Sequence, residues 1–122
     1  MNITKTEKNG HIIAIARADS LFLSDEQSAL DFIMTLSSET GSNRIALNKD
    51  GFSEEFFNLS TKLAGGILQK FIIYNIKFAI LGDFSSYTSK PLKDFIYECN
   101  KGNKIFFVSS EQDAIDKLSN AI

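Results

Sequence analysis

The chain of 122 residues has one cysteine, one histidine, one proline and no tryptophan. A single cysteine excludes an internal disulfide and a thiolate metal cluster, and a single histidine removes most zinc and haem ligand sets. We therefore expect a protein that binds no metal and no other cofactor and keeps its thiol reduced.

An excess of charge of one sign is also absent, because 13 basic and 15 acidic residues give a formal charge of -2 with no block of like charges. Nucleic-acid binding needs a basic patch, so we expect no nucleic-acid partner. The longest apolar-leaning run, Phe71 to Leu81, is interrupted by Asn75 and Lys77 and is shorter than the roughly 18 residues of a membrane helix. The first seven residues alternate and carry charge, unlike a signal peptide. We expect no membrane association and a cytoplasmic location.

The composition is that of an ordinary globular protein, with 43% hydrophobic and 23% charged residues. No internal repeat, low-complexity tract or linker interrupts the chain. A chain of this length fits one domain with a real core, so we expect a single domain over residues 1–122.

The first part of the chain predicts a hairpin and then a helix. Asn9-Gly10 lies between two strand-like stretches, and this dipeptide favours a type I′ turn because both central positions need positive φ. Ser24-Asp25-Glu26-Gln27 predicts a capping box with Ser24 as the N-cap and Gln27 reaching back, and Gly41 is expected to end the helix that follows.

The rest of the chain alternates strand and helix patterns. The expected strands are Arg44–Asn48, Lys77–Leu81 and Lys104–Val108. Helices are expected to begin at Ser60 or Thr61, near Ser89 with Pro91 in the first turn and Gly102 at the end, and at Ser109 or Ser110. The order predicts an α/β fold: a mixed sheet of four to five strands, with an N-terminal hairpin followed by right-handed parallel crossovers, packed with about four helices.

Three segments carry a resemblance that covers nearly the whole chain: Leu63–Phe71, Ala79–Ser85 and Ser89–Gly102. They are similar to the core of a small bacterial family known as domain of unknown function forty-one-eighty. The order and length of the elements also resemble the STAS fold, the sulfate-transporter and anti-sigma-factor-antagonist module of bacteria. That resemblance implies a regulatory, protein-binding role and a phosphorylatable hydroxyl after the middle strand, where this chain offers Ser53, Ser60 and Thr61.

Polar residues follow the strand that ends at Leu81. Ligands of open α/β sheets gather where loops leave the carboxyl ends of strands, and this loop carries Asp83, Ser85, Ser86, Tyr87 and Ser89. Asn48, Lys49 and Asp50 leave another strand end and are candidates for the same rim. One interpretation is a site for a partner or for a small ligand, such as a nucleotide or anion. The other is that these residues cap turns and helices.

Three phenylalanines, Phe52, Phe56 and Phe57, cluster where the pattern is irregular. If they are exposed they form an apolar interface patch; the alternative is burial under the sheet. Cys99 falls on the apolar stripe of its helix, which predicts a buried thiol with a raised pKa, and His11 is expected at the surface.

Three functional hypotheses follow. The first is a non-catalytic regulatory or protein-interaction module that binds a protein partner, or itself as a homodimer, through the strand-end loops and Phe52–Phe57. The second is a small-ligand sensor that uses the loop after Leu81. The third is an enzyme with Asp83 as general base, which requires a raised pKa and an enclosed cleft. A deep pocket beside Asp83 favours the second hypothesis, and a flat apolar surface favours the first.

Overall fold

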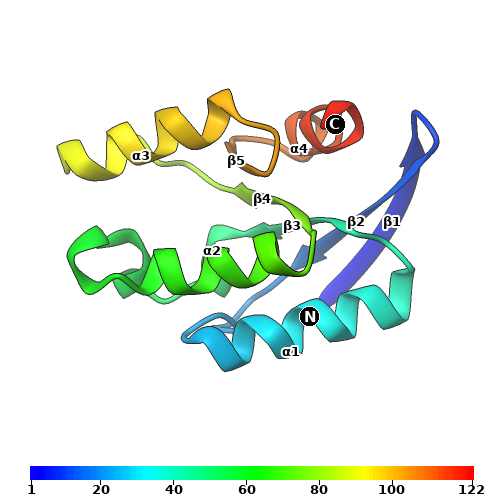
Figure 1. Ribbon diagram of the computed structural model, residues 1–122, viewed down its shortest axis with the longest axis horizontal. Coiled ribbons are helices and arrows are strands. Elements are labelled where there is room, and N and C mark those ends of the chain that lie inside the picture. The colour runs from blue at the N-terminus through cyan, green and yellow to red at the C-terminus, as the bar shows by residue number, and fades with distance from the viewer.

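A computed structural model describes residues 1–122 as a five-stranded mixed sheet with helices on both faces (Figure 1). The strands are β1 (Asn2–Lys8), β2 (His11–Arg17), β3 (Arg44–Asn48), β4 (Lys77–Leu81) and β5 (Ile105–Val108). They lie in the order β1-β2-β3-β4-β5, with β1 and β2 antiparallel and the other neighbours parallel. The predicted α/β fold, a hairpin followed by parallel crossovers, is confirmed.

Four α-helices and three short 3₁₀ turns connect the strands. They are α1 (Glu26–Thr40), η1 (Lys49–Gly51), η2 (Glu54–Phe57), η3 (Leu59–Thr61), α2 (Leu63–Ile73), α3 (Lys90–Lys101) and α4 (Glu111–Asn120). One face of the sheet is covered by α1, α2 and α3, and the other is covered by α4 alone (Figure 1). None of these helices has the length and apolarity needed to cross a membrane.

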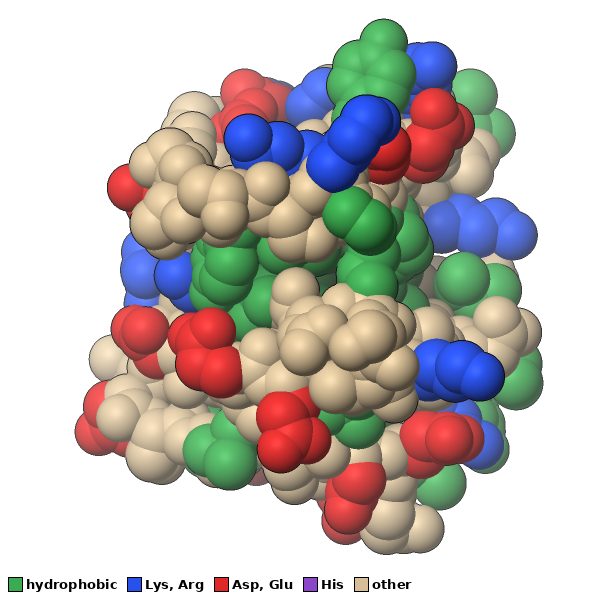
Figure 2. All heavy atoms as spheres, turned by 90° about the vertical axis from the view of Figure 1, so that its left-hand side faces the viewer, with side chains coloured by type: hydrophobic (Ala, Val, Ile, Leu, Met, Phe, Trp, Pro, Cys, Tyr) green, Lys and Arg blue, Asp and Glu red, His purple; other side chains and the backbone are tan.

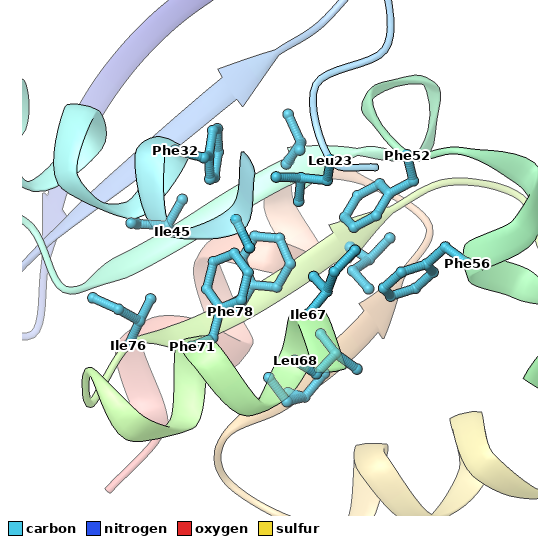
Figure 3. Packing of buried hydrophobic residues seen from close by; sticks show 14 of the residues in the cluster. Leu23, Phe32, Ile45, Phe52, Phe56, Ile67, Leu68, Phe71, Ile76 and Phe78 are labelled. Atoms are coloured by element: carbon cyan, nitrogen blue, oxygen red, sulfur yellow. The ribbon is translucent and has the colours of Figure 1, made fainter. Parts of the chain in front are cut away.

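The alternation of side chains along the strands produces two cores. The larger core lies between the sheet and the helices α1 and α2, and its phenylalanines pack against one another (Figure 3). Phe71 of α2 stacks on Phe78 of β4, with ring centroids 3.9 Å apart, and Phe32 of α1 meets the edge of Phe78 at 6.4 Å. The smaller core holds the opposite side chains of the sheet against Ala114 and Leu118 of α4. Every residue of β3 is buried because this central strand is covered on both faces.

The hairpin turn is as predicted, since Asn9 and Gly10 both have positive φ, at 54° and 78°. The cap of α1 is not as predicted. Asp25, and not Ser24, is the N-cap: its carboxylate accepts from the N–H of Ser28 at 2.7 Å, and the Ser28 hydroxyl accepts from the N–H of Asp25 at 3.1 Å. Aspartate caps as well as serine, and Ser28 takes the reciprocal role expected of Gln27. The helix ends at Gly41 with φ 70°, as expected.

The start of α2 also differs from the prediction. Ser60 and Thr61 belong to η3, and the N-cap is Lys62, which adopts a left-handed conformation and provides no side-chain cap. The Thr61 hydroxyl still accepts from the N–H of Leu63 at 3.3 Å. The other caps match the prediction: Ser89 caps α3, and of the two alternatives for α4 it is Ser110 that caps.

Arg44 of β3 links the sheet to the C-terminal end of α4. Its guanidinium is buried, and it donates to the carbonyl oxygens of Leu118 and Ala121, the latter at 2.8 Å. These carbonyls lie at the C-terminal end of the helix, where intrahelical donors are missing and where a cation is favoured.

Candidate functional site

The carboxyl ends of β2, β3, β4 and β5 meet in an open, polar cleft of about 550 Å³. Its walls include Arg17, Asn48, Lys49, Asp50, Asp83 and Glu111. Four predicted site residues, Asn48, Lys49, Asp50 and Asp83, therefore do share one rim. Arg17 and Glu111 are paired across it at 2.8 Å. The cleft is open rather than deep.

The Asn48 side chain is fully used by the fold. Its amide oxygen accepts from the N–H of Ala18 at 2.7 Å, and its nitrogen donates to the carbonyl of Ala18 at 2.8 Å. The same nitrogen lies 3.3 Å from a carboxylate oxygen of Asp50. This buried amide thus continues the pairing of β2 and β3 by one residue, and it has no free donor for a ligand.

Asp83 is exposed and acts as a turn cap. Its carboxylate accepts from the N–H of Ser85 at 2.9 Å, and its hydrogen bonds with Ser85 lower the pKa of Asp83, with a further contribution from the charge of Lys49. A lowered pKa makes the carboxylate a weak base, and the cleft beside it is open. Neither condition set for Asp83 as a general base is met.

The other polar residues of the loop have separate roles. The hydroxyl of Ser89 accepts from the N–H of Leu92 at the start of α3, so it is occupied as a cap. Ser85 and Ser86 are exposed, and neither lines the cleft beside Asn48. Of the predicted loop residues, only Tyr87 makes long-range side-chain contacts.

Tyr87 contacts two charged residues: Lys49, which was expected at the rim, and Glu54, which the sequence analysis did not single out. Its hydroxyl donates to the carboxylate of Glu54 at 3.3 Å, and the Lys49 ammonium lies 4.5 Å from the centre of its ring. Interaction with Tyr87 raises the pKa of Lys49, helped by the charges of Glu54 and Asp83, so this cation keeps its proton. Burial raises the pKa of Tyr87. No local spacing could indicate the contact with Glu54, which is 33 positions away.

The absence of a side chain at Gly82 allows Lys49 to lie beside the Tyr87 ring. A Cβ at Gly82 would lie 2.8 Å from the Cβ of Lys49, closer than two such atoms approach. A residue with a side chain here would push the Lys49 stem away from the Tyr87 ring. The glycine that follows β4 is therefore explained by the close approach of η1.

A row of aromatic rings runs from this cluster to α3. Successive centroid distances are 5.2 Å for Tyr87 and Phe57, 6.0 Å for Phe57 and Phe84, 5.3 Å for Phe84 and Phe107, and 6.1 Å for Phe107 and Phe95. Phe57 and Phe107 are buried, whereas Tyr87, Phe84 and Phe95 are only partly covered.

These partly covered rings belong to an apolar hollow on one side of the molecule. Figure 2 shows hydrophobic side chains at the floor of a depression between two polar layers, on the side where the loop before α3 faces η3 and the start of α2. We use the name apolar hollow for the partly buried hydrophobic residues of these segments and of α3 that pack against the larger core: Leu59, Leu63, Phe84, Tyr87, Phe95, Ile96 and Cys99. In α3 only Leu92 is fully buried, so most of the apolar stripe of this helix is incompletely covered.

Phe52, Phe56 and Phe57 do not form an exposed patch. They retain only 6%, 1% and 4% of their accessible surface, and each ring lies within 6.0 Å of the other two. Of the two alternatives, burial is correct. The irregular segment folds over the sheet because Leu23 pairs with Phe52 in an isolated parallel bridge.

The three hydroxyls suggested for phosphorylation differ in access. The Ser53 hydroxyl is buried and has no hydrogen-bond partner, so a kinase cannot reach it in the folded chain. Ser60 and Thr61 are exposed. The Ser60 hydroxyl lies 2.7 Å from the amide oxygen of Asn58, and that of Thr61 lies 2.8 Å from the Asn58 carbonyl.

The single cysteine is a weak nucleophile, and the single histidine begins a strand. Cys99 is half-buried in the apolar hollow, and burial raises its pKa to about 11. The direction agrees with the prediction, although the burial is less complete. His11 opens β2 opposite Lys8, and no group of three or more potential metal ligands occurs anywhere in the chain.

Comparison with known proteins gives one match. Searches of curated proteins and of solved structures find none. The family model described as "Domain of unknown function (DUF4180)" matches residues 8–118, which extend from the end of β1 into α4 and include every residue of the apolar hollow and of the rim. The chain therefore belongs to this domain family.

Proposed function

We propose that the protein is a non-catalytic, regulatory interaction module that binds an apolar segment of a partner protein in the apolar hollow. The observation that carries this proposal is the incomplete cover of α3: Phe95, Ile96 and Cys99 pack against the larger core and are only partly buried. A helix of this amphipathic pattern normally buries its whole stripe.

The chemistry of the hollow suits a protein partner. Partly covered aromatic rings are the side chains that most often anchor interfaces. Covering apolar surface contributes about 25 cal/mol per Å². Lys49 and Glu54 stand beside Tyr87 at one end of the row, where they can pair with polar groups of the bound segment and fix its direction. A regulatory role, which the STAS resemblance implies, is consistent with such a surface, with Ser60 and Thr61 as accessible sites for modification beside it.

The test compares two substitutions on neighbouring positions of α3. Ile96→Glu places a charge in the hollow, while Tyr97→Glu places one on the opposite side of the helix, where Tyr97 is 60% exposed. Each variant, and the parent protein, is immobilised and incubated with extract of the cells that produce it. We expect a protein that is retained by the parent and by Tyr97→Glu and is lost with Ile96→Glu. Nuclear magnetic resonance with the identified partner should then shift the signals of Phe84, Phe95 and Cys99.

Two results contradict the proposal. One is a partner retained equally by all three proteins, and the other is a shift pattern confined to residues outside the hollow. Circular dichroism of both variants is the control for folding: each variant should give the spectrum of the parent protein, so that a loss of binding does not result from unfolding.

A small-ligand sensor is the second candidate, and the rim cleft favours it. Arg17 and Lys49 are cations at the carboxyl ends of parallel strands, the usual position for an anion. Titration of inorganic phosphate and of a nucleotide, followed by nuclear magnetic resonance, distinguishes the two proposals. Saturable shifts at Arg17, Gly82 and Ser110 support the sensor, and their absence leaves the interaction module.

A further inference from the structure

The two edges of the sheet differ. At one edge, the Asn100 side chain bonds both backbone groups of Phe107 in β5: it accepts from the N–H at 2.8 Å and donates to the carbonyl at 3.2 Å. At the other edge, β1 is seven residues long and no element lies beyond it (Figure 1). An uncovered strand of this length presents a row of unpaired backbone groups.

The hydrogen bonds of β2 show which groups of β1 are free. The carbonyl of Ile12 accepts from Ser42, and both backbone groups of Ala18 bond Asn48, so the even-numbered residues here face β3. The odd-numbered residues of β2 therefore bond β1. Since His11 lies opposite Lys8, their partners are the even-numbered residues of β1.

The groups that remain, the N–H and C=O of Ile3, Lys5 and Glu7, point away from the sheet. All three side chains lie on the face covered by α1, because Lys5 is opposite Ala14 and Ile3 opposite Ala16, both of the larger core. Lys5 and Glu7 are exposed. The free edge thus combines outward backbone groups with one cation and one anion two positions apart.

We propose that β1 pairs with β1 of a second copy of this chain, antiparallel, about a two-fold axis that passes between the two Thr6 residues. This inference is independent of the apolar hollow. In that register Lys5 of each copy faces Glu7 of the other, so both ionic pairs are favourable. An axis at Lys5 would place two lysines opposite each other, and an axis at Glu7 would do the same for two glutamates; like charges directly opposite are destabilising. Of these three axes, only the one at Thr6 pairs opposite charges.

The pairing also gives partners to the outward backbone groups of Lys5 and Glu7. Lys5 and Glu7 of the second copy become a hydrogen-bonded pair that exchanges two N–H···O bonds, and the symmetry repeats this pair on the other side of the axis. Thr6 meets Thr6 in a non-hydrogen-bonded pair, where threonine hydroxyls stabilise one another. Ile3, Thr4 and Thr6 favour a strand, and β1 has no proline that would remove a backbone donor.

The experiment exchanges the charges of Lys5 and Glu7 and measures the molecular mass in solution. Sedimentation equilibrium of the parent protein from about 1 to 100 μM should show a shift from the chain mass of 13.6 kDa toward twice that value. Lys5→Glu and Glu7→Lys each create two like-charge pairs, so each should raise the dissociation constant about tenfold or more. The double variant, Lys5→Glu with Glu7→Lys, recreates both opposite-charge pairs and should restore dimerisation.

Hydrogen exchange gives a second readout. The amides of Lys5 and Glu7 should exchange fast in dilute protein and slowly in concentrated protein, whereas those of Thr4 and Thr6 are protected in both. A parent protein that stays monomeric over the whole range overturns the proposal. So does a dimer that survives the single substitutions, because it then uses another surface, and so does a double variant that fails to recover, because the register is then wrong.

Discussion

Two asparagines, Asn48 and Asn100, place a side-chain amide where a strand would otherwise place a peptide group. Each bonds the N–H and the C=O of a single residue, Ala18 and Phe107 respectively. Neither role was predictable from the sequence. Asn48 stands 30 positions from Ala18, and its place at a strand end suggested a ligand site instead. A polar residue at the carboxyl end of a strand is thus ambiguous until its partner is known.

Replacing Asn48 with alanine tests this structural role. The change leaves the N–H and C=O of Ala18 buried and unpaired, which should lower the free energy of unfolding by about 2 to 4 kcal/mol. Urea unfolding measures it, with the exposed Asn2→Ala as control. A loss under about 0.5 kcal/mol would show that water replaces the amide.

Cys99 was predictable, because its position on the apolar stripe of α3 indicated burial. Its raised pKa of about 11 means that the thiolate, the reactive form, is scarce at neutral pH. We expect the rate constant for alkylation by iodoacetamide to rise about tenfold per pH unit from pH 7 to pH 10 without levelling off. The same thiol in denaturant should level off near the ordinary pKa of 9.0. A plateau below pH 9 in the folded protein would contradict the assigned burial.

The helices and strands were predicted with their types correct, because their periodicities and their glycine and serine boundaries agree. Boundaries that depend on one hydroxyl or carboxylate were less certain. Ser24 and Asp25 are adjacent and both are good caps, so only the structure shows that Asp25 begins α1. At α2 the prediction of Ser60 or Thr61 was wrong because a left-handed Lys62 separates η3 from the helix.

A pair of alanine substitutions separates the two caps of α1. Asp25→Ala removes the acceptor for Ser28, and we expect the Tm at neutral pH to fall by about 4 °C. Ser24→Ala should leave it unchanged, because only the backbone of Ser24 contacts Ser28.

The pH dependence checks the same cap. Hydrogen bonding lowers the pKa of Asp25 in the folded state, so its contribution is present above the unfolded pKa and is lost as the pH falls through the folded one. The difference between parent and Asp25→Ala should therefore shrink in acid. Equal effects of the two substitutions would restore Ser24 as the cap.

At the scale of the whole molecule, the order of elements was enough to predict the mixed sheet, because a hairpin followed by crossovers leaves few topologies. The distribution of helices over the two faces was not predictable. Three helices cover one face, so α4 alone shields Ile13, Ala79 and Phe106 on the other. The apolar hollow was also missed, since it depends on how far α3 lies from α2 and not on any one residue.

Leu118 tests how much depends on this single helix. It is completely buried under the sheet, so Leu118→Ala should lower the free energy of unfolding by about 2 to 5 kcal/mol. Ile122→Ala, at a position that is 94% exposed, is the matched control and should change nothing. If both variants unfold like the parent in urea, the C-terminal helix contributes little to the fold.

The Asn100 clamp on Phe107 has a consequence for how far this protein can polymerise. A sheet with two free edge strands can add one chain after another and grow into a fibre. In this sheet the Asn100 side chain occupies the backbone groups of Phe107 at the β5 edge. In a dimer joined through β1, both outer edges of the combined sheet would be β5 strands blocked in this way, so assembly would stop at two copies. In such a dimer Asn100 would therefore limit assembly to two copies. The substitution Asn100→Ala would free the backbone of Phe107 on both outer β5 strands, so that further chains could add there.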